Sequence, residues 1–392
     1  MGENFDQPAK EPKVCNTSKE RSAIYQNTEN PFAEGQNCDD VSTGHPQEYS
    51  QIDANSSLCS SSSAMFILYK LPKISSEPAG TPLEDGEAYA YITSQDENNW
   101  TLSPHKITSH KSMLGRTWQG LKNKEQTATY LFYNDDSPEN FKGSAVGHLK
   151  GFLAFDNRNG YWLSHSIPRF GRMHSYEYPE TAVTNGQHAI CITFNVAALK
   201  KISKHLLYAH PNIYLRSLSD VVSLKLDQES RSLFTDKPAF IRSGDLTNVE
   251  GLNSIGGQSF LSFAKDNQFS GDLYSDIIAP GIKSSLYAET WRRGAGTNLK
   301  PACQTDYKII DIVAINMTAN DRGKNKNIYF KSTEDHSKWA VSIERGNNWV
   351  CMADMNRMAS QQRRGGGALC FKSSYASNAF KNIIAETDQC PI

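Results

Sequence analysis

Two His-x-Lys triplets are the residues of this sequence whose types and spacing best fit a defined chemistry. His148 is followed two residues later by Lys150, and His336 is followed by Lys338. A lysine ammonium can hold the non-bridging oxygens of a phosphate, while an imidazole can attack phosphorus or carry a proton to the departing oxygen. One pair would give a phosphate-binding site with one catalytic group. Two facing pairs would supply a nucleophile, an acid and two phosphate contacts, with no metal or other cofactor.

The spacing alone leaves a plainer interpretation open. With ten His and 41 Lys and Arg among 392 residues, roughly one H-x-basic triplet arises by chance. The alternative to a catalytic pair is therefore a solvated strand edge. The eight cysteines include no Cys-x-x-Cys pair, so the sequence predicts no zinc site of the common kind.

Strands are the elements expected to position both triplets. Residues i and i+2 of a strand point to the same face, so each histidine would project beside its lysine. The apolar patterns also predict an amphipathic helix over 195–210, a closing helix over 376–386 and a loop at the glycine run 365–367. Strands are expected over 65–72, 88–93, 128–134, 150–156, 161–167, 327–331, 338–343 and 349–353.

The order strand, H-x-K, strand occurs once in each half of the chain. It predicts two domains, residues 59–225 with His148 and residues 226–392 with His336. Residues 1–58 are polar and rich in Ser, Asn, Asp, Gln and Glu, so we interpret them as a flexible extension.

Composition points to an oxidising compartment. An even number of scattered cysteines is typical of disulfide-bonded proteins, and N-x-S/T sequons occur at Asn16, Asn55, Asn99 and Asn316.

No apolar run approaches the ~20 residues of a membrane helix, so no membrane insertion is expected. No signal peptide is visible, and we interpret the chain as a processed form carrying an added Met, with a cytosolic protein as the alternative. The formal net charge of -1 counts ten histidines as neutral, so acid would favour phosphate binding.

Long stretches around both triplets resemble the deoxyribonuclease II family. The first is Gly-His-Leu-Lys-Gly-Phe-Leu-Ala-Phe-Asp at 147–156, continuing over 160–168. The second is Ser-Thr-Glu-Asp-His-Ser-Lys-Trp at 332–339, followed by similar segments at 354–357 and 364–370. Residues 69–72 and 272–275 also match, and the resemblance covers roughly residues 60–390.

This resemblance implies an α+β fold of the phospholipase-D-like type, a pseudo-dimer of two related mixed αβ sandwiches that share one active site. It implies hydrolysis of DNA at acid pH without metal, leaving 3′-phosphate and 5′-hydroxyl ends, in a secreted or lysosomal protein. On the matching positions, it makes His148, Lys150, His336 and Lys338 catalytic and His165 important. The disulfides that it implies are Cys59–Cys191, Cys303–Cys390 and Cys351–Cys370, which leaves Cys15 and Cys38 as the remaining pair.

The sequence departs from the phospholipases themselves. Those enzymes carry an acid five residues after the motif lysine, where this chain has Phe155 and Ile343. For a nuclease we expect one neutral histidine to attack phosphorus and form a phosphohistidine, while the other, protonated, donates to the 5′ oxygen; the assignment of the two roles stays open. Two nearby lysines should lower both histidine pKa values, which would place the useful half-protonated state in acid.

Several residues near the triplets have two interpretations each. His165 could contact phosphate or orient a catalytic residue, or it could be a buried imidazole that supports the sheet. Asp354 or Asn356 could orient a catalytic imidazole, or could simply form a turn. Asp335 would point away from His336 if both lay in a strand.

The arginines near the glycine run, Arg357, Arg363 and Arg364, could contact DNA phosphate, with solvated surface positions as the alternative. At the level of the whole protein, a catalytically silent secreted protein that binds nucleic acid or a host partner competes with the nuclease. A phosphodiesterase acting on RNA or phospholipid is a third possibility. The sequence does not determine the oligomeric state.

Overall fold

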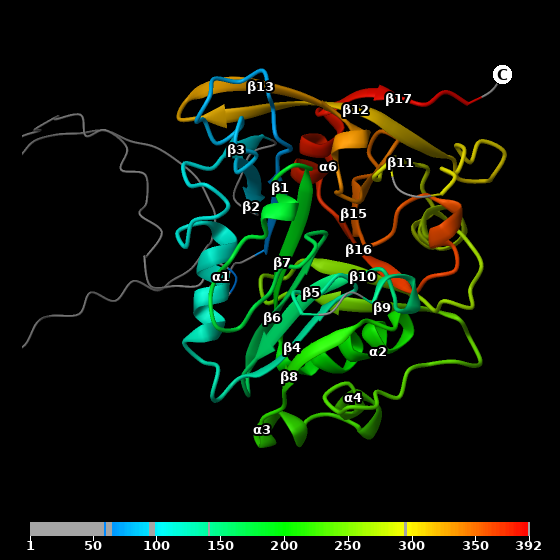
Figure 1. The fold of residues 1–392 in the computed structure, drawn as a ribbon. Coiled ribbons are helices and arrows are strands. Elements are labelled where there is room, and N and C mark those ends of the chain that lie inside the picture. The colour runs from blue at the N-terminus through cyan, green and yellow to red at the C-terminus, as the bar shows by residue number, and fades with distance from the viewer. Residues whose placement is uncertain (1–58, 60–64, 94–98, 140–141, 294–295, 391–392) are drawn as a thin grey trace, which may run out of the picture. The chain divides into compact units, whose positions relative to one another are not determined.

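The computed structural model describes residues 59, 65–93, 99–139, 142–293 and 296–390 (Figure 1). The expected extension at 1–58, with Cys15, Cys38 and the sequons at Asn16 and Asn55, lies outside the described residues. The described part is a mixed α/β fold with an extensive, mostly antiparallel sheet and few helices. The predicted α+β class is confirmed at this level. None of the described helices is long and apolar enough to cross a membrane.

The strands around the first triplet form one continuous series. Hydrogen bonding places them in the order β8-β4-β5-β6-β7-β1-β2-β3. Their bounds are β1 (Met65–Lys70), β2 (Tyr89–Thr93), β3 (Trp100–Leu102), β4 (Thr129–Asn134), β5 (Lys150–Phe155), β6 (Asn159–His165), β7 (Gln187–Asn195) and β8 (Ile213–Ser217). The helices in this part of the chain are α1 (Met113–Lys122), α2 (Leu199–Ala209), α3 (Asp220–Ser223) and α4 (Gln228–Ser232).

The strands around the second triplet form a similar series, in the order β9-β10-β16-β15-β14-β11-β12. Strand β12 also pairs with β13, β17 and, across the chain, with β3. The bounds are β9 (Thr247–Asn253), β10 (Ser259–Lys265), β11 (Leu286–Glu289), β12 (Ile309–Asp321), β13 (Lys324–Lys331), β14 (Trp339–Ser342), β15 (Trp349–Ala353), β16 (Gly366–Lys372) and β17 (Ile384–Thr387). A π-helical turn (Leu273–Ile278), α5 (Ala279–Ile282) and α6 (Ser374–Lys381) complete it.

The strands and the helix over 195–210 that the apolar patterns predict are present, with ends displaced by a few residues. Helix α2 carries its apolar stripe into the main core. It packs against β9, β10 and β16 (Figure 1), so a helix that precedes the second triplet by more than a hundred residues covers the second series of strands.

Two local predictions are wrong. The closing helix predicted over 376–386 ends at Lys381, because Ile384 to Glu386 pair with β12 as strand β17. The glycine run is not only a loop, since Gly366 and Gly367 begin β16. A Cβ on Gly367 would lie 2.2 Å from the carbonyl oxygen of Phe263. The glycine therefore allows a close approach of two paired strands, which is a common reason for glycine inside a sheet.

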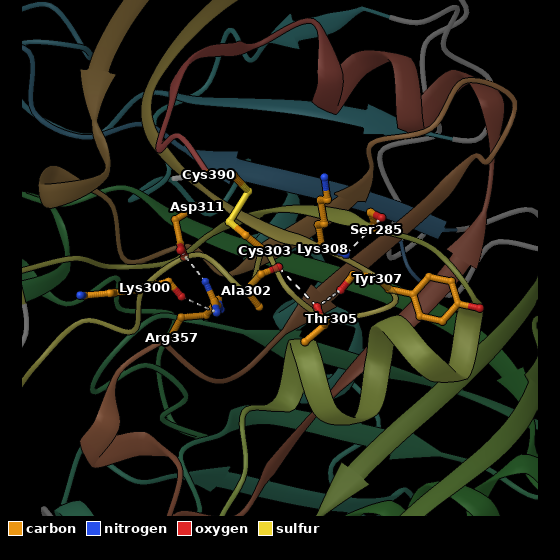
Figure 2. Close-up of a disulfide and its surroundings, with 10 residues drawn as sticks. All are labelled: Ser285, Lys300, Ala302, Cys303, Thr305, Tyr307, Lys308, Asp311, Arg357 and Cys390. Atoms are coloured by element: carbon orange, nitrogen blue, oxygen red, sulfur yellow. Dashed lines mark hydrogen bonds and ion pairs between the residues drawn. A yellow bond between two sulfur atoms is a disulfide. The ribbon is translucent and has the colours of Figure 1, made fainter. Parts of the chain in front are cut away.

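Disulfides connect distant parts of this fold in the three pairs that the resemblance implies: Cys59–Cys191, Cys303–Cys390 and Cys351–Cys370. Cys351 and Cys370 are direct cross-strand partners in β15 and β16. This bond closes the hairpin whose loop contains residues 354–365, so it braces the backbone on which Asp354 and Asn356 lie. The bond from Cys303 to Cys390 ties the end of the described chain to the loop before β12 (Figure 2).

Arg357 is a buried structural cation, and neither interpretation from the sequence holds for it. Its side chain is 2% exposed and donates through Nε to Asp272 at 3.0 Å and through Nη1 to Asp311. Its Nη2 donates to the carbonyl oxygen of Lys300 at 3.2 Å, close to the Cys303–Cys390 disulfide (Figure 2). The guanidinium thus joins three segments, and it is unavailable to DNA.

We therefore expect Arg357→Met to destabilise the fold by about 3–5 kcal/mol, because it leaves two buried carboxylates without their cation. The measurement is the free energy of unfolding from urea titration of the oxidised protein. Arg363→Met, at an exposed position in the same loop, is the matched control and should change it by about 0.5 kcal/mol or less. Equal effects of the two substitutions would contradict this role for Arg357.

Candidate active site

The two H-x-K triplets do not lie within strands as expected: only Lys150 of the first belongs to its strand, and the whole second triplet precedes its strand. Strand β5 begins at Lys150 and β14 begins at Trp339, so His148, His336 and Lys338 precede the regular pairing. Each histidine is instead fixed by a backbone hydrogen bond to a distant segment. The His148 amide donates to the carbonyl of Gly365 at 2.8 Å, and the His336 amide donates to that of Gly186 at 2.8 Å.

The two triplets line one cavity of about 500 Å³. His148 and Lys150 enter it from the start of β5, and His336 and Lys338 from the segment before β14. The remaining lining residues are Asp135, Asp136, Ser166, Pro168, Arg169, Thr181, Trp291, Asn356, Met358, Gln361 and Arg364. Segments that are far apart in the sequence therefore meet at the place where the sequence predicts phosphodiester chemistry.

The contacts of His148 determine which of its nitrogens is available. Nδ1 lies 2.6 Å from the backbone oxygen of Asp354. A carbonyl oxygen can only accept, so in the neutral imidazole the proton belongs on Nδ1 and the lone pair on Nε2. His336 packs its ring against Trp291, with ring centroids 4.0 Å apart. Its Nε2 is buried and has no hydrogen-bond partner among the described residues, so it can bond to a bound substrate.

Lys150 belongs to a buried charge network. Its Nζ donates to one carboxylate oxygen of Asp135, whose other oxygen accepts from Arg364 at 2.9 Å. Arg364 also donates to the backbone oxygens of Gly143 and Val146. Two cations share one carboxylate, so this corner of the cavity carries a net positive charge suited to an anion.

Lys338 has a different environment. Its Nζ donates to the backbone oxygen of His336, and its own amide donates to Nδ1 of the buried His188 at 3.0 Å. Burial, followed by the charge of Lys150, lowers the pKa of Lys338 to about 7. Its ammonium is therefore fully charged only in acid, whereas an ordinary lysine stays charged to well above neutral pH.

Both catalytic candidates among the histidines have depressed pKa values, but the lysines are not the main cause. Burial is the largest contribution, and it lowers the pKa of His336 to about 3, with Lys338 and Lys150 adding to the effect. Burial followed by Lys150 also holds the pKa of His148 well below its usual range. Both imidazoles therefore favour the neutral form in the free protein, and a phosphate anion bound beside them would favour the protonated form of either one.

The other predicted site residues divide into lining and supporting positions. Asn356 lines the cavity, and its side-chain oxygen accepts from the amide of Trp291 at 3.3 Å. Asp354 holds His148 through its backbone, while its carboxylate accepts from the amide of Gly367 at 3.1 Å. Burial raises the pKa of Asp354 to about 7.

Asp335 bonds to Tyr69 and Ser337 and not to His336, as expected, although it lies in no strand.

His165 is 2% exposed, ends strand β6 and is not among the residues that line the cavity. Its Nδ1 accepts from the amide of Ile167 at 3.1 Å, and its ring packs edge-on against Phe170. Burial, then Lys150, lowers its pKa to about 3. No cluster of three or more His, Cys, Asp or Glu suited to a metal ion occurs among the described residues.

Sequence reasoning missed three residues that contact the two triplets, namely Asp135, His188 and Trp291. It proposed Arg364 only as a DNA contact. None of the three new residues belongs to a spaced motif. Asp135 directly follows the predicted strand 128–134, and a carboxylate at a strand end is the one signal that could have been used. Trp291 and His188 carry no such signal, since only packing brings them to His336 and Lys338.

Comparisons with known proteins show the family of this chain. The family model described as deoxyribonuclease II matches residues 62–390. Deoxyribonuclease-2-beta of Mus musculus is 36% identical over 330 residues, covering 83% of this chain and 89% of that protein. Plancitoxin-1 of Acanthaster planci is 34% identical over 335 residues, and deoxyribonuclease-2-alpha of Sus scrofa is 33% identical over 332, with 89% and 87% of those proteins covered. The chain belongs to the deoxyribonuclease II family.

Proposed function

We propose that this protein is an acid endonuclease that hydrolyses the phosphodiester bonds of DNA without a metal ion. The observation that carries the proposal is the meeting of both H-x-K triplets at one cavity, His148 with Lys150 and His336 with Lys338. Relatives named deoxyribonuclease-2 match over most of their length, which supports DNA as the substrate. Two imidazoles and two lysines are the groups that a metal-free displacement at phosphorus requires.

In the proposed mechanism His148 is the nucleophile, because its Nδ1–H is held by a carbonyl and leaves the Nε2 lone pair free. Nε2 attacks phosphorus, the bond to the 5′ oxygen breaks, and that oxygen takes a proton from His336. Water then gives a proton back to His336 and attacks the phosphohistidine. The phosphorus–nitrogen bond breaks, which releases a 3′-phosphate and returns His148 to its neutral form.

The lysines bind the charge that this reaction develops. Lys150 and Lys338 hold the non-bridging oxygens, where they neutralise the phosphodiester and stabilise the additional negative charge of the transition state. The lowered pKa of Lys338 supplies a reason for a preference for acid: below about pH 7 the ammonium is present, and above it the charge is lost. The substrate-induced protonation of a histidine acts in the same direction.

We also propose that residues 59–225 and 226–392 are related halves of a phospholipase-D-like pseudo-dimer. The support is a corresponding series of five antiparallel strands around each triplet. The series is β4-β5-β6-β7-β1 in one half and β11-β14-β15-β16-β10 in the other. In each, the strand after the triplet is the first of a hairpin. The halves differ at their edges, since β4 pairs antiparallel with β8 but β11 pairs parallel with β12.

A secreted or lysosomal location completes the proposal. Three disulfides require an oxidising environment to form. The two sequons among the described residues, at Asn99 and Asn316, are exposed and therefore accessible to glycosylation.

The first test replaces each motif histidine. His148→Ala and His336→Ala should each lower the rate of nicking of supercoiled plasmid at pH 5 in EDTA by about 10³-fold or more, because each removes an obligatory nucleophile or acid. His174→Ala, at an exposed position outside the cavity, should keep wild-type activity. Full activity of either motif variant, or an inactive wild type with its disulfides intact, would count against the nuclease.

A second test concerns pH. Lys338→Arg keeps its charge at pH 8, where the lysine has largely lost its proton, so the ratio of nicking rates at pH 8 and pH 5 should be severalfold higher than in the wild type. The ratio is the quantity to compare, because Arg and Lys differ in shape and the absolute rate will fall. Lys237→Arg, at an exposed position, should leave the ratio unchanged. If Lys338→Arg had the same ratio of rates as the wild type, the ammonium of Lys338 would not be a cause of the acid preference.

A further inference from the structure

Arg169 has a left-handed backbone conformation, which is uncommon for a residue other than glycine. Four non-glycine residues have positive φ within the described part of the chain: Arg169 at 56°, His210, Lys283 and Arg322. His210 and Lys283 are C-caps of α2 and α5, and Arg322 lies in the two-residue turn between β12 and β13. Left-handed residues are ordinary at such places. Arg169 lies in the turn at residues 168–169, directly after Pro168. A positive φ at the second central position of a turn usually belongs to Gly or Asn, so arginine is unusual there. This turn borders the catalytic cavity.

The loop that carries Arg169 is held from several sides, so its conformation is imposed and not accidental. The amide of Arg169 donates to the backbone oxygen of Asp136 at 2.7 Å. The side-chain amide of the buried Asn134 donates to the backbone oxygens of Ile167 and Phe170 at 3.2 and 3.4 Å. Backbone strain of this kind persists where the surroundings over-determine the conformation, often at functional sites.

His165 belongs to the same support. Its Nδ1 accepts from the amide of Ile167, which fixes the start of the loop, and its ring packs against Phe170 at the end. On the far side Tyr214 donates to the backbone oxygen of Gly171 at 2.7 Å. These contacts hold both ends of the loop 167–171, and the Arg169 side chain lies among those that line the cavity.

The Arg169 side chain differs from the other cations that line the cavity. Lys150 and Arg364 are nearly buried and share Asp135, and Lys338 is buried beside His336. Arg169 has a side chain that is 55% exposed, with Nε 3.2 Å from Asp136. Among the described residues, none pairs with its two terminal nitrogens. Asp136 orients the guanidinium at the rim and leaves the forked end of the group open to solvent.

We propose that Arg169 binds a backbone phosphate of the DNA strand next to the phosphate that is cleaved. A guanidinium fork matches two phosphate oxygens, and a rim position meets the neighbouring phosphate once the scissile one lies between the two histidines. This assignment rests on the proposed function. It makes Arg169 a substrate-binding residue and makes His165 a positioning residue that acts through the loop 167–171.

The test measures binding separately from cleavage. In a His336→Ala background, which prevents cutting, fluorescence anisotropy of a short labelled duplex at pH 5 gives the association constant from 25 to 200 mM NaCl. Arg169→Gly should lower the slope of log K against log salt by about 1 and weaken binding about five- to tenfold at the lowest salt, because one phosphate contact is lost. Glycine adopts positive φ freely, so this variant should fold at least as stably as its parent.

Two controls separate charge from structure. Arg169→Lys keeps a cation at the same backbone position and should retain the parental slope. Arg172→Ala removes an arginine whose side chain is 56% exposed, which pairs with Glu177 outside the cavity, and it should change neither slope nor affinity. An unchanged slope in Arg169→Gly, or an equal loss in Arg172→Ala, would overturn the proposal. If the otherwise wild-type protein fails to nick plasmid while Arg169→Gly still loses slope, the nuclease function fails and the phosphate contact stands.

Discussion

The site depends on two backbone hydrogen bonds, each of which joins one triplet to the part of the chain that follows the other triplet. The amide of His148 donates to Gly365, which follows the second triplet, and the amide of His336 donates to Gly186, which follows the first. Neither histidine lies in a strand, so these bonds replace the regular pairing that would otherwise fix the backbone. Because each triplet is held by the part of the chain that carries the other, neither half of the site can take its position alone.

Close backbone approach is the condition for this arrangement, and glycine provides it. A Cβ on Gly186 would lie 2.4 Å from a carboxylate oxygen of Asp335, and one on Gly365 would lie 2.3 Å from the backbone oxygen of Ala209. Both glycines are partners of the motif histidines, and both sit where a side chain would push the segments apart. The disulfide between Cys351 and Cys370 closes the hairpin that contains Gly365, so a covalent bond supports the same contact.

Burial is the main cause of the shifted pKa values in the site. It lowers the pKa values of the imidazoles and of Lys338, and it raises that of Asp354. A site that carried all of its charges in the empty state would be costly to bury. The buried histidines favour the neutral form, and the buried charges of Lys150 and Arg364 are paired with Asp135. The anionic substrate completes the charge balance, which couples binding to the proton that the reaction needs.

The two H-x-K motifs and most strands around them could be predicted from local residue order and apolar periodicity. The family and the three disulfide pairs followed from the resemblance of long segments to the deoxyribonuclease II family, because cysteine spacing alone leaves the pairing open. Only the tertiary structure decided which distant segments hold the motif histidines, that Arg357 is buried between Asp272 and Asp311, and that Trp291 packs against His336. Periodicity reports which face of a segment is apolar, but not which distant segment lies against it. The cavity is formed entirely by such long-range contacts, so its walls could not be predicted from the order of residues.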